Sequence, residues 1–311
     1  MGFDKNTVNN QIVILPELEK FGVDLFVKRE DKIHPIISGN KYRKLKYNIF
    51  KAHDDDYNTL LTFGGAFSNH ISAVAFTGKE FGFKTIGIIR GDELGDDLQK
   101  TLRNNPTLRI AHENGMKFDF VTRSDYRLKI TADFIRKLEE KFGKFYLIPE
   151  GGTNDLAVKG CGEILKSKDD DFDIICSAIG TGGTISGLIN SVKDHQRILG
   201  FPALKGDFLE KEIKAYTIQD ENWSLIYDYH FGGFAKINEE LINFINYFRN
   251  ETSIPLDPIY TGKMMFGIVD MIKKGKFKEG TKILAIHTGG LQGIEGMNNR
   301  LKKKYLPLIL E

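Results

Sequence analysis

The stretch Ser38-Gly39-Asn40-Lys41-Tyr42-Arg43-Lys44 sets a lysine between a Gly-Asn turn and a run that has the pattern of a helix. A lysine binds an aldehyde as an imine only when its amine is partly deprotonated, which requires burial or nearby cations. Arg43 and Lys44 are the nearest candidate cations. Because most lysines lie on the surface, a solvated basic helix start is the simpler explanation of this stretch taken alone.

The chain has 311 residues, enough for two domains or for one large α/β unit. Its formal charge of +2 gives no electrostatic reason to expect nucleic acid or an acidic membrane as a partner. It has no apolar run of about 20 residues and no secretory signal pattern, so we expect a cytoplasmic protein. Cys161 and Cys176 are too few for a disulfide framework and lack metal-ligand spacing, so we expect two buried thiols and assign no metal.

Short apolar runs alternate with helical patterns along most of the chain. We expect helices at residues 41–52, 68–81, 97–104, 130–142, 156–165, 184–192, 239–248 and 262–274. We expect strands at residues 12–15, 23–28, 59–63, 85–89, 118–121, 145–148, 174–177, 213–218 and 282–287. Strands that alternate with helices of this length pair in parallel through crossover connections, so the predicted fold class is α/β with two open parallel sheets. The small, polar stretch 149–154 is typical of a crossing between two domains.

Residues 180–184, Gly-Thr-Gly-Gly-Thr, follow an apolar strand and open a helix. Their backbone N–H groups and hydroxyls converge where the helix dipole is positive, so we expect this turn to bind a phosphate. The turn lacks the Gly-Lys-Ser/Thr of a P-loop and the acidic partner of a dinucleotide site. The alternatives are a turn that binds nothing and an unrelated nucleotide site.

Residues 64–70 form a second strand-turn-helix junction, in which Gly64 and Gly65 let a ligand approach the backbone. Ser68, Asn69 and His70 offer polar groups at a helix N-terminus, which suits a carboxylate or a phenolate. The alternative is structural, because Ser and Asn commonly cap helices and a lone His is commonly a hydrogen-bonded helix residue.

Two further stretches could place side chains in a site. Tyr260, in residues 257–263, precedes a helix and could transfer a proton, although most tyrosines are simply packed. Thr288, in residues 287–290, follows a strand and lies where open α/β sheets bind ligands, although a plain turn explains it equally well.

An imine lysine, a phosphate turn and polar loops at strand ends are together what a pyridoxal 5'-phosphate enzyme requires. The sequence resembles the tryptophan-synthase-β-like, fold-type-II pyridoxal-phosphate enzymes, and within them the 1-aminocyclopropane-1-carboxylate deaminase / D-cysteine desulfhydrase family. The resemblance runs from residue 27 to residue 293. It rests on Lys28-Arg29-Glu30-Asp31, Gly39-Asn40-Lys41 with Arg43-Lys44-Leu45, Gly64-Gly65 with Ser68-Asn69-His70, Gly182-Gly183-Thr184, Asp257-Pro258-Ile259-Tyr260-Thr261-Gly262-Lys263 and His287-Thr288-Gly289-Gly290.

The resemblance implies a role for each of these stretches. Lys41 holds the cofactor as an imine and, once the substrate displaces it, takes the Cα proton, with Ser68 and Tyr260 as the other catalytic residues. The implied cofactor contacts are Lys41, Asn69, Thr181, Gly182, Gly183, Thr184 and Thr288. The implied substrate contacts are Ser68, Asn69, His70 and Thr261. The resemblance further implies a homodimer, a cofactor-binding domain of residues 1–44 and 150–311, and a small α/β domain of residues 45–149.

Two positions distinguish members of the family. Deaminase-like members carry Glu where this chain has Thr261 and Leu where it has Thr288, and desulfhydrase-like members carry hydroxyl residues at both. A hydroxyl beside the pyridine nitrogen leaves a weaker electron sink than a carboxylate does, and a weaker sink suffices when a β-substituent leaves directly. We therefore expect α,β-elimination of the D-cysteine desulfhydrase type, with release of a 2-oxo acid, ammonia and sulfide. The alternatives are 1-aminocyclopropane-1-carboxylate deaminase, which gives 2-oxobutanoate and ammonia, and a non-catalytic homologue that binds the cofactor.

The chain departs from the family pattern where a second active-site tyrosine is expected. That region reads Tyr229-His230-Phe231-Gly232-Gly233-Phe234-Ala235, with no tyrosine clearly in register. Tyr229 and His230 are the candidates to replace it.

Overall fold

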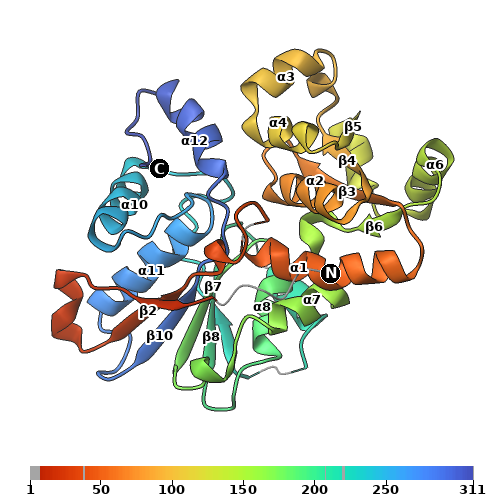
Figure 1. The fold of residues 1–311 in the computed structure, drawn as a ribbon. Helices are drawn as coiled ribbons and strands as arrows, with labels where there is room; N and C mark the ends of the chain where they lie inside the picture. Colours follow the sequence, from red (N-terminus) through yellow and green to blue (C-terminus); the bar gives the residue numbers. More distant parts are fainter. Residues whose placement is uncertain (1–7, 38, 207, 219–220, 311) are drawn as a thin grey trace.

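The computed structural model describes residues 8–37, 39–206, 208–218 and 221–310, which fold around two sheets (Figure 1). The larger sheet, in the order β1-β2-β10-β7-β8-β9, consists of β1 (Asn10–Ile12), β2 (Asp24–Lys28), β10 (Lys282–Ile286), β7 (Ile174–Ile179), β8 (Arg197–Pro202) and β9 (Trp223–Leu225). The smaller sheet, in the order β5-β4-β3-β6, consists of β5 (Lys117–Val121), β4 (Lys84–Arg90), β3 (Thr59–Gly65) and β6 (Tyr146–Ile148). Within these ranges every pairing is parallel except that of β1 with β2, so the predicted parallel arrangement is confirmed for the other strands.

Helices cover both faces of the larger sheet, with α10 and α11 on one side and α7 and α8 on the other (Figure 1). The helices of this unit are α7 (Asp155–Gly162), α8 (Gly183–Ile189), α9 (Phe208–Lys214), α10 (Glu239–Thr252), α11 (Thr261–Lys273) and α12 (Gly293–Lys302). Alternate side chains of β10 point to opposite faces of the sheet. Ile283 and Ala285 pack on the side of α10 and α11, and Leu284 and Ile286 pack on the side of α7 and α8. A strand buried on both faces reads as a continuous apolar run, which is why the sequence revealed it.

The smaller unit carries α2 (Asn69–Phe81), α3 (Leu98–Asn104), α4 (Pro106–Glu113), α5 (Arg123–Arg127) and α6 (Ala132–Phe142). Short 3-10 turns occupy Pro16–Phe21, Glu30–Lys32, Asp92–Leu94, Glu150–Gly152 and Ser167–Asp169. Helix α1 (Asn40–Asp54) packs against both α7 and α2, so it joins the two units. Cys161 and Cys176 are buried free thiols, as predicted. In the described part of the chain no helix is long and apolar enough to cross a membrane.

Three expectations about the elements are wrong. The strand predicted at residues 213–218 overlaps α9, whose Leu209 and Ile213 are buried one helical turn apart. The prediction lacks β8, because Gly200 and Pro202, residues typical of turns, interrupt its apolar run. The first strand lies at Asn10–Ile12 rather than at residues 12–15.

The larger sheet takes its strands from residues 10–28 and 174–286, and the smaller from residues 59–148. The division into domains at residues 44 and 150 stays a prediction.

Candidate active site

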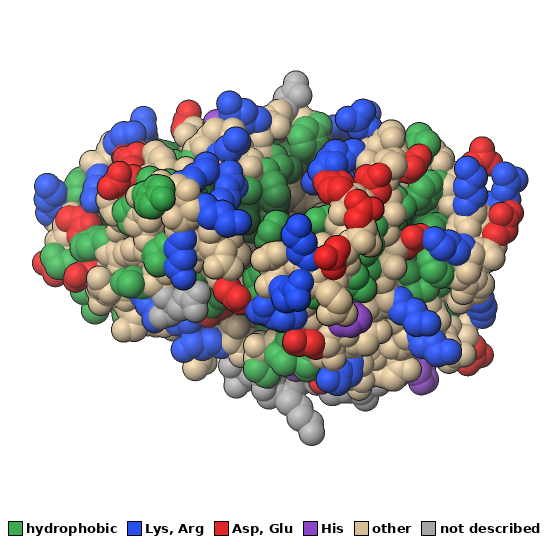
Figure 2. Space-filling view, turned by 90° about the horizontal axis from the view of Figure 1, so that it is seen from above, with side chains coloured by type: hydrophobic (Ala, Val, Ile, Leu, Met, Phe, Trp, Pro, Cys, Tyr) green, Lys and Arg blue, Asp and Glu red, His purple; other side chains and the backbone are tan. Residues whose placement is uncertain are grey.

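A cavity of about 530 Å³ lies where strands of both sheets reach their carboxyl ends. Gly65 ends β3, Arg90 ends β4 and Ile179 ends β7, and all three line the cavity, at the end of a parallel sheet where ligands bind. From above, the surface is hollowed between the two units, with apolar side chains in the hollow and basic ones on both sides (Figure 2). The predicted site residues that line the cavity are Lys41, Ser68, Asn69, His70, Thr181, Gly182, Thr184, Tyr260 and Thr288.

The first residues of helix α1 pack against the loop that follows β10. Gly39 has a φ of 60°, and a Cβ there would lie 2.1 Å from the carbonyl oxygen of Thr288, so only glycine fits. The Asn40 N–H donates to the same oxygen at 3.3 Å, and its side-chain amide donates to Thr184 Oγ1 at 2.8 Å. These contacts fix the first turn of α1, which carries Lys41.

Lys41 and Lys44 lie on one face of α1, and both amines donate to the carbonyl oxygen of Gly151 at 3.2 Å. Burial first, and the Lys44 cation second, lower the pKa of Lys41 to about 7. Much of Lys41 is therefore deprotonated near neutral pH, in the form that attacks an aldehyde. Arg43 is not the relevant cation, because its guanidinium pairs with both oxygens of Glu30 at 3.0 Å.

Lys44 is a buried cation that contacts only neutral oxygens among the described residues. Its side chain is 2% exposed, and its amine also donates to Thr153 Oγ1 at 2.9 Å and to Thr181 Oγ1 at 3.4 Å. Burying an ammonium group without an anion is costly, and burial lowers its pKa. An anion held at the 180–184 turn would supply the missing counter-charge.

The 180–184 turn approaches Lys44 closely. Gly183 does not line the cavity, but a Cβ there would lie 2.8 Å from the Thr153 side chain and 3.2 Å from the Lys44 amine, so glycine makes room for both. Helix α8 has only seven residues, which limits its dipole, so Lys44 supplies most of the positive charge at this turn. The sequence placed Lys44 beside Lys41 but did not identify Gly151 and Thr153 as its partners. The small polar residues at 149–154 were the available signal.

Ser68 and Asn69 keep polar groups free on the cavity wall. Ser68 precedes the first residue of α2, yet its side chain does not cap the helix. The Asn69 Oδ1 atom is buried without a partner among the described residues. Gly290, with a φ of 92°, packs against this side chain, since a Cβ there would lie 3.0 Å from Asn69 Nδ2. Buried polar groups nearly always have partners, so the Asn69 amide indicates a ligand, and the Ser68 hydroxyl is not engaged as a helix cap.

His70 is a neutral, hydrogen-bonded residue on the inner wall. The Thr62 hydroxyl donates to the Ile148 carbonyl at 2.8 Å, so at 2.9 Å it accepts from His70 Nε2–H. Burial, followed by the Lys41 and Lys44 cations, lowers the pKa of His70 well below its usual range. His70 is 1% exposed, and the hydrogen bond at Nε2 fits the structural alternative, but its Nδ1 atom is buried without a partner among the described residues. The contact of His70 with substrate stays a prediction.

Tyr260 and Phe234 form the aromatic part of the wall, with ring centroids 6.3 Å apart at an angle of 60°. Burial and nearby carboxylates raise the pKa of Tyr260, so its phenol is protonated near neutral pH. A Cβ on Gly180 would lie 3.3 Å from this hydroxyl, which places the phenol at the start of the phosphate turn. Neither Tyr229 nor His230 lines the cavity; of the stretch 229–235, Phe234, which has no hydroxyl, and Ala235 do so.

Thr261 and Thr288 occupy different environments. Thr261 is fully buried and does not line the cavity. Its hydroxyl donates to the Asp257 carboxylate at 2.6 Å and accepts from the Asp257 N–H at 2.9 Å, so both functions of the hydroxyl are used. The structure therefore brings Thr288, but not Thr261, to the site.

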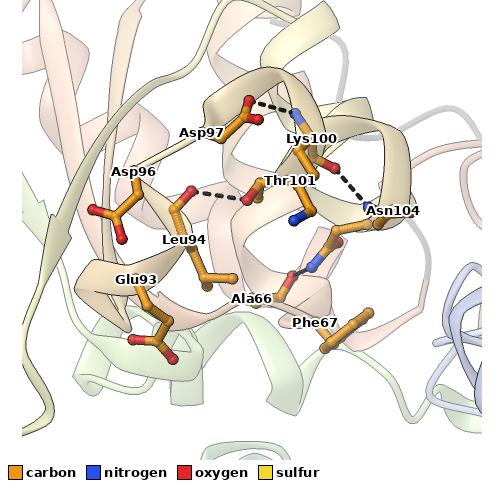
Figure 3. Close-up of a pocket in the computed structure, with 10 residues that line it drawn as sticks. Ala66, Phe67, Glu93, Leu94, Asp96, Asp97, Lys100, Thr101 and Asn104 are labelled. Carbon is orange, nitrogen blue, oxygen red and sulfur yellow. Dashed lines mark hydrogen bonds between the residues drawn. The ribbon is translucent and has the colours of Figure 1, made fainter.

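A second cavity, of about 440 Å³, lies behind the turn that leads to Ser68 (Figure 3). Ala66 and Phe67 line both cavities. Asn105, at the start of α4, donates to the Ala66 carbonyl at 2.9 Å, and Thr101 of α3 donates to the Leu94 carbonyl at 2.8 Å. Asn105 at the start of α4 thus supports the turn from behind, and α3 packs against α4.

The lining residues fit pyridoxal 5'-phosphate on two observations. Lys44 lacks a counter-ion at the turn predicted to bind a phosphate, and the Asn69 amide oxygen lacks a partner. The amine of Lys41, with its pKa of about 7, is available for an aldehyde in the same cavity.

Comparisons with known proteins agree with this site. Residues 5–289 match the family model described as pyridoxal-phosphate dependent enzyme. A Pyrococcus furiosus protein is 32% identical to this chain, in an alignment that covers 91% of this chain and 89% of the Pyrococcus protein. The bifunctional D-cysteine desulfhydrase/1-aminocyclopropane-1-carboxylate deaminase of Arabidopsis thaliana mitochondria is 31% identical over 88% of this chain and 74% of its own. The crystal structure of a 1-aminocyclopropane-1-carboxylate deaminase homologue, 28% identical, superposes with a TM-score of 0.80 over 98% of this chain and 94% of its own.

These matches confirm the predicted tryptophan-synthase-β-like fold and its cofactor. The chain is a pyridoxal-phosphate dependent enzyme and belongs to the 1-aminocyclopropane-1-carboxylate deaminase / D-cysteine desulfhydrase family.

Proposed function

We propose that this enzyme removes a β-substituent from a small amino acid by α,β-elimination and releases a 2-oxo acid and ammonia, and also sulfide when the substrate is D-cysteine. The observation that supports it best is the Lys41–Lys44 pair, in which an amine with a pKa of about 7 adjoins a buried cation that has no counter-ion among the described residues. The first group suits proton transfer at Cα, and the second suits the cofactor phosphate.

Each lining residue has a proposed task. The bound cofactor withdraws electrons from the substrate Cα. Lys41, freed when the substrate amine replaces it, takes the Cα proton, because with a pKa of about 7 about half of its amine is deprotonated at pH 7. Ser68 and the N–H groups of its turn hold the substrate carboxylate. Tyr260, whose phenol keeps its proton, donates a proton to the leaving group.

The remaining residues hold the cofactor. Thr181, Gly182 and Thr184 bind the phosphate together with Lys44. The Asn69 side-chain N–H would donate to the cofactor's 3'-oxygen, and the Thr288 hydroxyl would lie on the side of the pyridine nitrogen.

The polar groups of the cavity favour elimination over ring opening. Thr288 offers a neutral hydroxyl rather than a carboxylate, and Tyr260 is the one phenol among the described lining residues. A thiolate leaves Cβ with both electrons of the Cβ–S bond, so its departure needs at most one proton donor. Opening a cyclopropane ring requires a proton on carbon and a stronger electron sink.

The alternative is cleavage of 1-aminocyclopropane-1-carboxylate to 2-oxobutanoate and ammonia. The name of the Arabidopsis thaliana relative includes both activities and so keeps this alternative open. A homologue that binds the cofactor without catalysis is the second alternative, and the absence of a hydroxyl at Phe234 favours it.

Release of 2-oxo acids from a substrate panel separates these functions. The holoenzyme is supplied with D- and L-cysteine, D- and L-serine, and 1-aminocyclopropane-1-carboxylate. We expect pyruvate and sulfide from one cysteine enantiomer, abolished by Lys41→Ala and retained by Lys51→Ala at the far end of α1. 2-Oxobutanoate as the main product would establish the alternative. A protein that binds the cofactor but releases no 2-oxo acid would refute the lyase proposal.

A further inference from the structure

Two guanidinium groups line the cavity without an ion pair to a described carboxylate. The charged lining side chains among the described residues are Lys41, Lys44, Arg90, Arg300 and Glu150. Glu150 already pairs with Lys129 at 3.2 Å. Lys44 faces the phosphate turn and Lys41 is the reactive amine, so two guanidinium groups have no assigned anion.

Arg90 lies beside the turn that leads to Ser68. It pairs in register with Gly65, and its Nη2 atom lies 3.5 Å from where a Cβ on Gly65 would be. The guanidinium carbon lies 5.6 Å from the centroid of the Tyr126 ring, a contact that orients the group without neutralising it. Arg90 is an exposed residue, and its guanidinium is open to a ligand at the small-unit side of the cavity.

Arg300 lies on the opposite wall, on the face of α12 that lines the cavity. That face also includes Gly293, Gly296 and Met297, spaced three and four residues apart. Glycine lets the helix approach closely, because a Cβ on Gly296 would lie 3.3 Å from the ring of Phe67.

The position of Arg300 along α12 sets the length of ligand that it can reach. Its Cα lies about 10 Å along the axis from Gly293, which faces Asn69. Its side chain inclines back toward the helix N-terminus, and its Nη1 donates to the Ala235 carbonyl at 3.2 Å. The guanidinium is thereby held at the cavity rim, and no ion pair with a described carboxylate neutralises it.

Building on the proposed lyase function, we propose that the preferred substrate carries a second acidic group on its β-substituent, and that Arg90 and Arg300 bind this group. Phe67 and Phe234, 58% and 49% exposed, provide apolar walls for the linking atoms. The substrate class is an S- or O-substituted amino acid whose leaving group ends in an anion. In S-carboxymethylcysteine the second carboxylate lies about 5 Å from Cα when the chain is extended.

The reaction is balanced for such a substrate. The Cα proton passes to Lys41, and the Cβ–S bond breaks with both electrons on sulfur, which leaves as mercaptoacetate. Water then hydrolyses the released aminoacrylate to pyruvate and ammonia.

Matched substrates test the charge requirement. The holoenzyme is assayed with S-carboxymethylcysteine and with S-carbamoylmethylcysteine, which has the same shape and no second charge, as both enantiomers. We expect kcat/KM to be at least tenfold higher for the acid, and the preference to fall to within about twofold in Arg90→Gln and Arg300→Gln. Lys302→Gln, which removes a charge from α12 outside the cavity, should keep the preference. Equal kcat/KM values for acid and amide would overturn the proposal.

A binding measurement keeps this proposal separate from the lyase proposal. 2-Aminoadipate has a methylene in place of the sulfur and cannot eliminate, and its 6-amide is the uncharged match. Calorimetry on the holoenzyme should give at least tenfold tighter binding of one aminoadipate enantiomer than of its amide, lost in Arg300→Gln. If no substrate releases a 2-oxo acid but this difference persists, only the lyase proposal fails. If elimination occurs but the amide binds equally well, only the second-anion proposal fails.

Discussion

Lys44→Met tests the origin of the low pKa of Lys41, because it removes the neighbouring cation and keeps most of the side-chain volume. Both amines donate to the Gly151 carbonyl at 3.2 Å. They therefore lie within roughly 6 Å of each other, where two unit charges repel by about 3 kcal/mol at an effective dielectric constant of about 20. This energy corresponds to about 2 pKa units.

Burial is the larger cause of the shift and persists in the variant. We therefore expect the pKa of Lys41 to rise from about 7 by about one to two units and to stay below the ordinary value of 10.5. Only a deprotonated amine is acylated, so labelling of Lys41 as a function of pH, followed by peptide mass spectrometry on cofactor-free protein, gives the midpoint directly.

Lys51→Met is the control, because Lys51 lies about 15 Å along α1 from Lys41, beyond the Debye length of about 10 Å in 0.1 M salt. In Lys51→Met, the midpoint for labelling of Lys41 should equal that of the wild type. A wild-type midpoint near 10 would refute the burial argument. A midpoint near 7 that Lys44→Met leaves unchanged would refute the electrostatic role of Lys44.

Three further predictions concern the residues around the lysine pair. Gly39→Ala should abolish cofactor retention, measured by absorbance after gel filtration, because the new Cβ would lie 2.1 Å from a carbonyl oxygen, whereas Gly275→Ala, at a φ of 64° with no atom within 4 Å, should retain it. Glu30→Gln should cost about 3 kcal/mol in urea unfolding by breaking the buried Arg43 pair, against less than about 1 kcal/mol for Glu295→Gln at an exposed pair. Because folding lowers the pKa of His70, the unfolded chain binds the extra proton below pH 6.5, so stability should fall with decreasing pH by up to about 1.4 kcal/mol per unit, and His70→Gln should flatten that slope.

Elements with strong local periodicity were predictable from the sequence, and those defined by long-range contacts were not. Helices α1, α2, α10 and α11 follow predicted ranges closely, because each presents one continuous apolar face. The short β9 and the five-residue α5 carry too few residues to show a period, and their neighbours in the fold define them.

At the site, the residues that line the cavity were predictable as motifs, but their partners were not. The Gly151 and Thr153 acceptors lie more than 100 residues from Lys44 in sequence, and pairing at that separation leaves no local pattern. The same holds for Arg90 and Arg300, which come from different units and meet only at the cavity.

The structure changes which position can distinguish deaminase from desulfhydrase chemistry. A glutamate in place of Thr261 would stand against the Asp257 carboxylate, which already accepts bonds from the Thr261 hydroxyl and amide at 2.6 and 2.8 Å. Two buried carboxylates in contact cannot both ionise at neutral pH. A glutamate there would therefore be protonated, or it would turn toward the cavity and break the hydrogen bonds to Asp257 that hold the start of α11. Thr288 lines the cavity and has no such conflict, so Thr288→Asp, which places a carboxylate there, is the cleaner test of the electron-sink argument, with the uncharged Thr288→Asn as its control. A substrate profile that is the same in both variants would refute the argument.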